Sequence, residues 1–529
     1  MANNSPGGSG RGNKGTAVID DPDRPQCPDC GGFMASDGRK KPLWKCTDCG
    51  KKLAKKGAFR RSVDDFTKQW GFDIEAAEKY AQSCQKYKRI IVTSAQNNTP
   101  LFHPFWKSLN QAAAHFNCPI AVIPVHYKNV SAWNRDDKKE WPPEVQPYLV
   151  KGDIEFNNVT IKSDIKIAAT AINPLAGLQA MGGNHWTVFG HAQCGMEPVA
   201  TPADIMPKRL YTTGSVSMEN YSISKEGEKA RFHHTMGALL IEKHKDICFV
   251  RRLNCDDNGH FYDLDVKFTQ TTATKGHRLL SLTTGDEHVK FNTVEKETYT
   301  GRGSIVKTLR PQYIVRHDVL DGYAGSHHHE KDPLLQFKKH HNGDNDYRAE
   351  LEQAIDFINR TTPKDAKTLI VPSNHHDHLY KWLATADANK DHTNAILICE
   401  LQKAMREAVL SGENPDPFYL YAKDKLTCEY EFLDRSKQYL IGGVDHSQHG
   451  DVGVNGSRGS TKAFANVVFK CTKGHDHTAR EARGALSVGK STGRMEYENG
   501  LSTHTNTHVA QYQNGKRTHI DIFDGRWKA

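Results

Sequence analysis

The chain has 529 residues, of which 37% are hydrophobic, so several folded domains with ordinary cores are expected. No run of about 18 apolar residues occurs, and the first residues, MANNSPGGSG, lack the apolar stretch of a signal peptide, which argues against membrane spans and secretion and for a cytoplasmic protein. The net charge is +9, and residues 1–61 hold thirteen Lys or Arg against six Asp, so the basic character is concentrated at the N-terminus.

The first two segments are a tail and a cysteine module. Residues 1–22 are rich in Gly, Asn and Ser and are predicted to be disordered. Residues 23–61 contain two Cys-x₂-Cys pairs, which can complete a tetrahedral zinc shell with no open position. The sequence therefore predicts a zinc ribbon with one structural zinc, and the remaining eight scattered cysteines are expected to be reduced. The predicted ligands are Cys27, Cys30, Cys46 and Cys49.

Basic residues and one aromatic residue surround the predicted zinc ribbon. Positive side chains attract phosphates independently of base sequence, and an indole ring can stack on a base. The sequence thus predicts DNA as a partner, while a solubilising tail and a protein-docking ribbon stay open as alternatives. The predicted DNA-binding residues are Arg39, Lys40, Lys41, Trp44, Lys45, Lys51 and Lys52.

Residues 62–275 are predicted to form an α/β accessory domain. Apolar spacing at 63–85 suits one or two short helices, and the segments 88–95, 105–116 and 118–127 suggest a strand, a helix and a strand. That order implies parallel pairing. The strand-rich pieces at 154–162 and 247–254 follow, and this domain offers no recognisable chemistry.

Residues 276–485 contain five apolar runs, each followed by a cluster of His, Asp or Asn. Because active sites of layered α/β proteins gather at the carboxyl ends of strands, these clusters are expected to converge on one sheet edge. The runs and clusters are 280–285 before Asp286 and His288, 313–315 before His317, Asp318 and Asp321, 368–371 before Asn374 and His375, 439–441 before His446 and His449, and 467–469 before His475 and His477.

Helices and a short extension complete the expected architecture. Apolar periodicity predicts helices at 348–360 and 392–410. Residues 486–529 are predicted to be a β-rich C-terminal extension with a turn at Asn514 and Gly515.

The donor atoms of the five clusters are oxygens and imidazole nitrogens. This mixture suits Mn²⁺, Fe²⁺, Zn²⁺ or Ni²⁺ better than an all-oxygen magnesium site. A bridging Asp, an Asn and several His can hold two ions about 3.5–4 Å apart, which is the geometry that activates water for attack on a phosphate.

The series of clusters resembles the calcineurin-like metallophosphoesterase superfamily, whose signature runs D-x-H, G-D-x-x-D, G-N-H-D/E, H and G-H-x-H. The resemblance covers 275–485 and implies an α/β (layered α+β) fold, in which a β-sandwich flanked by helices follows the α/β domain and the zinc ribbon. By this resemblance Asp286, His288 and His477 hold one metal, Asn374, His449 and His475 hold the other, Asp318 bridges, and His375 is the catalytic imidazole that protonates the leaving oxygen.

The sequence departs from the signature at several positions. His317 and Ser373 stand where the superfamily has Gly, and His376 stands where an acidic residue is usual. The first two changes remove no ligand but are expected to reshape the loops around the phosphate, and the acidic Asp377 directly follows His376. For the fourth ligand His446 is an alternative to His449, and the resemblance favours His449 because the superfamily's ligand often stands in a short His-Gly context, as His449-Gly450 does.

The resemblance implies hydrolysis of phosphate esters with Mn²⁺ as the expected metal, and the basic ribbon favours DNA. The phrases KRIIVTSAQNN, IPVHYKN and VPSNHHDHLYKW are also similar to early proteins of tailed phages implicated in degrading host DNA. That similarity implies a homo-oligomer in the cytoplasm of an infected bacterium. A phosphatase or nucleotidase, and a DNA-binding protein with a relic metal site, are the alternatives.

Overall fold

The computed structural model describes residues 71–529 except 128–139, 203–204, 327 and 496–497, and the backbone of three strands before residue 71. The chain divides into two compact units, Met1–Trp70 and Gly71–Ala529. In the first unit the three strands form an antiparallel sheet of β1 (Met34–Ser36), β2 (Leu43–Cys46) and β3 (Lys52–Ala54).

The predicted zinc and DNA-binding residues fall largely outside the described residues. Cys46, Trp44 and Lys45 lie in β2 and Lys52 lies in β3, where only the backbone is described. The zinc ribbon and its DNA-binding surface therefore stay predictions. The residues outside the described part are the tail 1–22 together with Cys27, Cys30, Cys49, Arg39, Lys40, Lys41 and Lys51.

The second unit begins with the predicted strand–helix–strand arrangement. The run 89–96 is buried over seven of its eight residues, as expected for a strand covered on both faces, and it pairs in parallel with the next strand, which confirms this prediction. Two later strands complete a four-stranded sheet in the order β12-β11-β4-β5. The elements are α2 (Ile74–Cys84), β4 (Arg89–Gln96), α3 (His103–Phe116), β5 (Ile120–Val125), β11 (Gly237–His244) and β12 (Ile247–Asn254).

A ten-stranded mixed sheet is the largest in the unit. Its order is β20-β21-β22-β24-β23-β9-β10-β8-β7-β6, so it joins strands from the predicted accessory segment 62–275 to strands from the predicted catalytic segment 276–485. The strands are β6 (Asp153–Phe156), β7 (Val159–Lys162), β8 (Trp186–Phe189), β9 (Gly195–Val199), β10 (Lys208–Thr212), β20 (Leu440–Ile441), β21 (Val444–Asp445), β22 (Lys470–Lys473), β23 (Arg480–Ala482) and β24 (Ala485–Ser487).

A six-stranded sheet in the order β19-β18-β17-β16-β25-β26 carries most of the residues of interest. The first four strands in that order are parallel, and the hairpin from the predicted extension 486–529, turning at Asn514 and Gly515 as predicted, adds the last two. The strands are β16 (Ser281–Thr283), β17 (Tyr313–Arg316), β18 (Lys367–Ile370), β19 (Tyr430–Phe432), β25 (Thr507–Gln511) and β26 (Arg517–Asp521).

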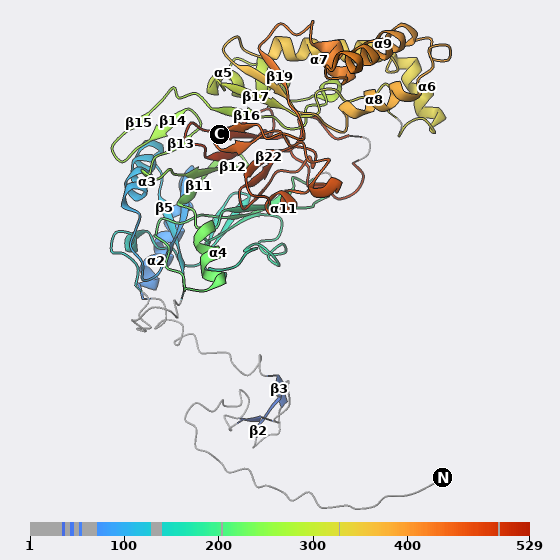
Figure 1. The fold of residues 1–529 in the computed structure, drawn as a ribbon. Coiled ribbons are helices and arrows are strands. Elements are labelled where there is room, and N and C mark those ends of the chain that lie inside the picture. The colour runs from blue at the N-terminus through green and yellow to red at the C-terminus, as the bar shows by residue number, and fades with distance from the viewer. Residues whose placement is uncertain are drawn as a thin grey trace, which may run out of the picture. The chain divides into compact units, whose positions relative to one another are not determined.

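Helices cover one face of the six-stranded sheet and gather at one end of the unit (Figure 1). Leu351, Ile355 and Ile358 of the predicted helix 348–360 are buried in this core, as its apolar period requires. Both predicted helices are confirmed. The helices are α5 (Ile305–Leu309), α6 (Pro333–Asn342), α7 (Tyr347–Thr361), α8 (His376–Thr385), α9 (Ala395–Ser411) and α10 (Pro417–Ala422).

The other face of the six-stranded sheet packs on the ten-stranded sheet. Gln511 Nε2 donates to the carbonyl oxygen of Ile441 at 2.7 Å, and Leu486 and Val509 share a small apolar cluster. The four-stranded sheet packs in turn on β6–β8, and α3 covers its outer face. The resulting architecture is mixed α/β with stacked sheets and helices, which agrees with the predicted fold class at this coarser level.

The remaining elements are short. No helix in the described part of the chain is long and apolar enough to cross a membrane. These elements are α4 (Lys225–His233), α11 (Thr461–Phe464), β13 (Phe261–Asp263), β14 (Val266–Phe268), β15 (Ala273–Thr274), the 3₁₀ helices η1 (Gln146–Tyr148), η2 (Val289–Phe291) and η4 (Val454–Gly456), and the π-helix η3 (Lys296–Thr300).

One predicted strand is wrong in position. The run 467–469 forms a bend in which Val468 is fully exposed, and the strand begins afterwards at Lys470. Three consecutive apolar residues do not show which of them face the core, whereas the buried residues of β22 include Cys471 and Lys473.

Candidate metal centre

The predicted metal ligands lie on five loops, and each loop follows a strand. Three of these strands are parallel neighbours in the six-stranded sheet, and two belong to the ten-stranded sheet. The clusters therefore meet between two sheets, and the expectation of a single sheet edge is wrong. The residues are Asp286 and His288 after β16, Asp318 after β17, Asn374 and His375 after β18, His449 after β21, and His475 and His477 after β22.

One half of the cluster contains Asp286, His288 and His477, the residues predicted to hold the first ion. His477 Nε2 lies 3.3 Å from Asp286 Oδ2 and 3.1 Å from His288 Nε2. His288 Nε2 also lies 3.7 Å from Asp318 Oδ2. Donor atoms of Asp286, Asp318 and His477 lie within 4.8 Å of one another, as a shared cation requires.

The other half contains the residues predicted to hold the second ion. His475 Nδ1 lies 3.1 Å from Asn374 Oδ1, and the rings of His449 and His475 are 5.2 Å apart. His449 Nε2 lies 3.3 Å from the same Asp318 oxygen that faces His288. Asp318 thus stands between the two halves, where a bridging carboxylate is expected.

The backbone of the cluster is strained at several of these residues. The φ angles are 38° at His288, 48° at Asp318, 74° at His475 and 52° at His477. A side chain in this left-handed region costs about 1–3 kcal/mol, and such strain concentrates at functional sites. Gly474 directly follows β22, and no side chain fits there because a Cβ would lie 2.3 Å from Asp286 Oδ1.

Several buried polar atoms of the cluster make no hydrogen bond within the described part of the chain. They are Asp286 Oδ1, both carboxylate oxygens of Asp318, and His449 Nε2. Leaving buried acceptors unsatisfied is costly in a folded protein. Divalent cations among these atoms would satisfy them, so the residues present fit a metal site.

The two buried carboxylates have opposite electrostatic environments. Burial and the nearby Asp318 carboxylate raise the pKa of Asp286 well above its ordinary value. Burial alone would also raise the pKa of Asp318, but the imidazoles of His449 and His375 lower it well below its ordinary value. A bound cation beside both groups would keep both ionised, as metal ligation requires.

Two of the predicted histidine ligands, His475 and His477, are held in the neutral form that binds a metal. Burial, followed by the neighbouring His449, lowers the pKa of His475 to about 4, and burial together with His288 lowers the pKa of His477 well below its ordinary value. Burial would likewise lower the pKa of His375, but Asp318 and Asp321 raise it. The pKa of His375 is therefore shifted in the opposite direction from the pKa values of His475 and His477, so His375 carries a proton more readily than they do.

Asp321 orients two histidines of the centre, a role that the sequence did not assign. Its Oδ1 lies 2.6 Å from His288 Nδ1, and its carbonyl oxygen lies 2.7 Å from His375 Nδ1. Both imidazoles then donate a hydrogen bond through Nδ1, and their Nε2 atoms remain available to the candidate metal centre. The signal was present, since Asp321 belongs to the second predicted cluster.

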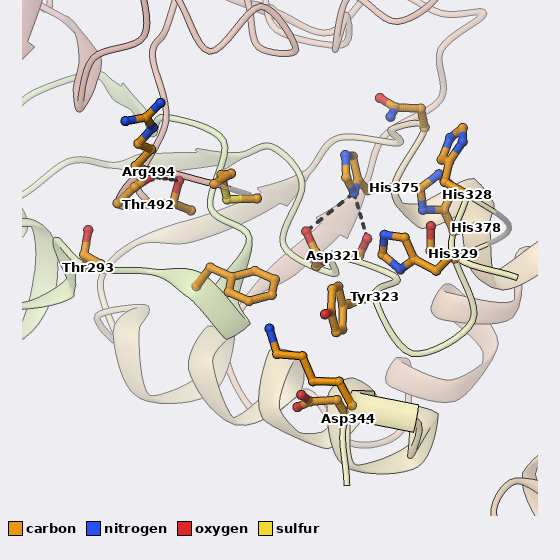
Figure 2. Close-up of a pocket in the computed structure, with 16 residues that line it drawn as sticks. Thr293, Asp321, Tyr323, His328, His329, Asp344, His375, His378, Thr492 and Arg494 are labelled. Atoms are coloured by element: carbon orange, nitrogen blue, oxygen red, sulfur yellow. Dashed lines mark hydrogen bonds and ion pairs between the residues drawn. The ribbon is translucent and has the colours of Figure 1, made fainter. Parts of the chain in front are cut away.

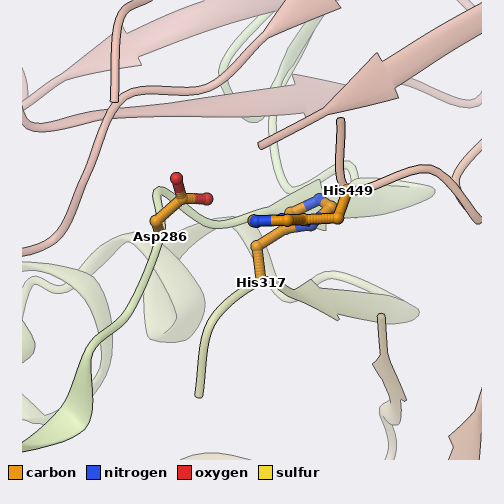
Figure 3. A group of neighbouring side chains, drawn as sticks. All are labelled: Asp286, His317 and His449. Atoms are coloured by element: carbon orange, nitrogen blue, oxygen red, sulfur yellow. The ribbon is translucent and has the colours of Figure 1, made fainter. Parts of the chain in front are cut away.

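His317 adds an imidazole where the superfamily signature has Gly. It is fully buried, its Nδ1 lies 3.2 Å from His449 Nδ1, and its donor atom forms a group with those of Asp286 and His449 that could hold a metal (Figure 3). Burial and the adjacent His449 lower its pKa well below the ordinary value. His317 is thus a further neutral donor at the centre.

His446, the competitor for the fourth ligand position, faces away from the centre. Its Nδ1 lies 3.2 Å from Thr283 Oγ1 and its Nε2 lies 2.8 Å from Gln511 Oε1. Both ring nitrogens are therefore engaged in the packing between the two sheets. This geometry favours His449 as the ligand.

A buried ion pair joins the loops that carry the first ligands. Arg316 Nη1 lies 2.9 Å from Glu287 Oε1, and neither side chain is exposed. Glu287 stands between Asp286 and His288, and Arg316 precedes His317 and Asp318 in the chain. The pair therefore clamps the ends of β16 and β17 and fixes the spacing of their ligands.

A further His–carboxylate group lies on the outer side of His477. Donor atoms of His477, Glu498 and His504 lie within 4.8 Å of one another, and His504 Nδ1 is 2.9 Å from Glu498 Oε1. Lys490 Nζ is 2.5 Å from the same carboxylate. Because the Lys490 ammonium already neutralises Glu498, this group is less suited to a cation than the cluster around Asp318, and the rings of His477 and His504 lie 5.3 Å apart.

A cavity of about 710 Å³ opens beside the centre (Figure 2). Asp321, Asn374 and His375 line one side of it, and Lys338 and Arg494 add positive charge. The side chain of His375 is 20% exposed, whereas those of His288 and His449 are fully buried. His375 is therefore the site histidine best placed to contact a molecule in the cavity.

The fold and the site define a mixed α/β protein with a buried Asp and His cluster that could hold metal ions. The chain is 32% identical to Protein A1 of Escherichia phage T5 over 466 residues, which are 84% of this chain and 83% of that protein. It belongs to the family of phage T5 Protein A1. No protein-family model and no solved structure matches the chain. Its relationship to a phage protein is thus shown, while the metallophosphoesterase resemblance stays a prediction.

Proposed function

We propose that this chain is a metal-dependent phosphodiesterase that cleaves DNA. The observation that carries the proposal is the buried cluster around Asp318, whose unpaired acceptors call for cations and which borders a cavity lined by His375 and basic side chains. Two divalent ions, Mn²⁺ being the expected metal, would polarise a phosphate there and activate water.

The protein's own residues have separable roles in this reaction. The strained loops after β17 and β22 hold the ligand atoms in place before any ion binds, so little reorganisation is needed. Asp321 orients His375, and the raised pKa of His375 suits an imidazole that donates a proton to the departing sugar oxygen. Lys338 and Arg494 at the cavity attract the phosphate backbone.

DNA is the preferred substrate for two reasons. The positive charge concentrated in residues 1–61 predicts attraction to a polyanion far larger than a small phosphate ester. The family relationship to a phage protein agrees with the predicted role in degrading host DNA. A phosphatase acting on small monoesters is the alternative that the same cluster would allow.

The test is to incubate the purified full-length protein with Mn²⁺ and linear duplex DNA, closed circular DNA, single-stranded DNA or p-nitrophenyl phosphate. We expect DNA cleavage that requires the metal and disappears in His375→Ala, because the leaving oxygen then loses its proton donor. His392→Ala removes an exposed histidine outside the centre and is the matched control.

Each outcome distinguishes the candidates. Hydrolysis of p-nitrophenyl phosphate without DNA cleavage would establish a phosphatase. Absence of hydrolysis on every substrate, in a protein that binds Mn²⁺, would overturn the proposed activity. Cleavage that persists unchanged in His375→Ala would remove that residue from the chemistry.

A further inference from the structure

The loop that orients the site histidines also presents an aromatic ring to the cavity. Asp321 contacts His288 and His375, and Tyr323, two residues further on, lines the same cavity (Figure 2). The position of the Tyr323 ring relative to the metal centre is therefore set by one short segment. Phe291, at the end of η2 and three residues after His288, packs edge to face with the Tyr323 ring, with ring centroids 5.4 Å and ring planes 79° apart.

Tyr323 is held firmly by two helices. The Glu350 carboxylate of α7 accepts hydrogen bonds from the backbone nitrogens of Tyr323 and Ala324 at 3.0 and 2.9 Å. Lys339 of α6 donates to the carbonyl oxygen of Tyr323, and its Nζ lies 4.5 Å from the centre of the Tyr323 ring. The ring is thus preorganised, and little conformational entropy is lost when a ligand packs on it.

The cavity combines two kinds of wall. Phe291, Tyr323 and Met495 supply flat or apolar surface, while Lys338 and Arg494 supply positive charge. Its volume of about 710 Å³ lies within the range of about 300–1,000 Å³ typical of pockets that enclose small molecules. An unpaired nucleotide matches this pattern, with an aromatic base and a charged phosphate, whereas an intact double helix is too wide to enter.

We propose that this cavity binds an unpaired nucleotide of the substrate strand, with its base against Tyr323 and Phe291 and its phosphate toward His375. The assignment rests on the proposed function, because it assumes phosphodiester chemistry at the centre, and it adds to that function the form of the DNA substrate. The substrate is then DNA with a free, frayed or single-stranded segment, since paired bases must leave the stack to reach such a site.

The test compares binding of thymidine 5′-monophosphate with binding of deoxyribose 5-phosphate, which lacks the base. Titration calorimetry on the full-length protein, with Ca²⁺ in place of Mn²⁺ to suppress turnover, measures both affinities. We expect the nucleotide to bind more tightly and Tyr323→Leu to weaken it by about 5- to 100-fold, as loss of one base–aromatic stack does. Tyr380→Leu, which removes a ring on α8 that is 53% exposed, is the matched control.

A second variant, Phe291→Leu, removes the aromatic ring that adjoins Tyr323 in the cavity wall and serves as the test if Tyr323→Leu does not fold. Equal affinities for the two ligands, or a nucleotide preference unaffected by both variants, would overturn the assignment. The measurement needs no turnover. Base-dependent binding in a protein that hydrolyses no ester would therefore leave the cavity assignment standing and remove only the proposed function, while DNA cleavage without base-dependent binding would do the reverse.

Discussion

Two regions of the second unit bury charged side chains, and they differ in whether an opposite charge of the same chain neutralises them. Between β10 and β26, Arg209 and Asp521 are each 1% exposed and form an ion pair of 2.7 Å, and two threonine hydroxyl groups accept further hydrogen bonds from the same guanidinium. In the candidate metal centre, Asp286 and Asp318 are equally buried, yet three of their carboxylate oxygens have no hydrogen-bond partner among the described residues.

The comparison distinguishes a closed region, in which the Arg209 and Asp521 charges neutralise each other, from an open region, in which the Asp286 and Asp318 carboxylates have no Lys or Arg of the described residues as an ion-pair partner. A buried charge is tolerated when its partner comes from the same chain, and the Arg209 pair is complete in this sense. The carboxylates of the centre are complete only when something from outside the chain supplies positive charge. The first arrangement stabilises the packing of two sheets, and the second is suited to binding ions.

The largest expected effect follows from Asp318→Asn. The amide cannot serve as a bridging carboxylate, so Mn²⁺ binding and DNA cleavage should fall by more than the about 10–100-fold that loss of an outer-shell partner costs. Metal content by elemental analysis and the rate of cleavage measure this. Asp365→Asn, at a position that is 64% exposed, is the control and should match the wild type. Full metal content in Asp318→Asn would show that the centre does not need this residue.

Arg209→Leu should destabilise the fold by about 3–5 kcal/mol, because it leaves the Asp521 carboxylate buried and unpaired. The double variant with Asp521→Leu should recover much of that loss, since no uncompensated charge remains. Urea unfolding in the presence of EDTA measures both. If Arg209→Leu had the same free energy of unfolding as the wild type, the Arg209–Asp521 ion pair would not stabilise the packing of the two sheets.

Metal binding should stabilise the fold through Asp318 and its neighbours, independently of the Arg209–Asp521 pair. At a free Mn²⁺ concentration of 100 times Kd, the free energy of unfolding should rise by about 2.7 kcal/mol per site, and EDTA should remove this gain. Asp318→Asn should lose the gain, whereas Arg209→Leu should keep it. An equal gain in both variants would place the bound metal outside the proposed centre.

Acid should lower the free energy of unfolding through His519, which lies near the Arg209–Asp521 pair, by less than Arg209→Leu does. Burial, with a further contribution from Arg209, lowers the pKa of His519 to about 4, so the folded form keeps this imidazole neutral. The unfolded chain binds the proton from pH 6.5 downward, so stability falls between pH 6.5 and 4, by about 2 kcal/mol at pH 5. Urea unfolding of wild type and His519→Gln at pH 7 and pH 5, in EDTA, should show a smaller loss in the variant.

The sequence predicted the residues of the centre far better than their arrangement. Order and spacing identified the loops, because a polar cluster after a strand is a local pattern. The pairing of β23 with β9, which joins residues 480–482 to 195–199, has no local signal and could not be predicted. Hence the sequence placed all the clusters on one sheet edge, whereas two sheets contribute.

The choice between His446 and His449 shows the same limit. Both follow β21 within a few residues, and the sequence favoured His449 only through the Gly that follows it. The decision depends on Thr283 and Gln511, whose strands are far away in sequence and engage both nitrogens of His446. The supporting residues Asp321 and His317 were visible in the clusters, but their contacts were not.

The pairing of β16 with β25 has a consequence for synthesis of the protein. The strand that leads to Asp286 is bounded on one side by β25, which follows far later in the sequence, and the Gly285 nitrogen donates to His508 Nδ1 at 2.8 Å. Until residues 507–511 have been translated, the Asp286 loop lacks this neighbour. A nascent chain that has not yet reached β25, or a chain shortened before it, therefore lacks this support of the Asp286 loop, and the candidate metal centre is complete only after β25 has been added.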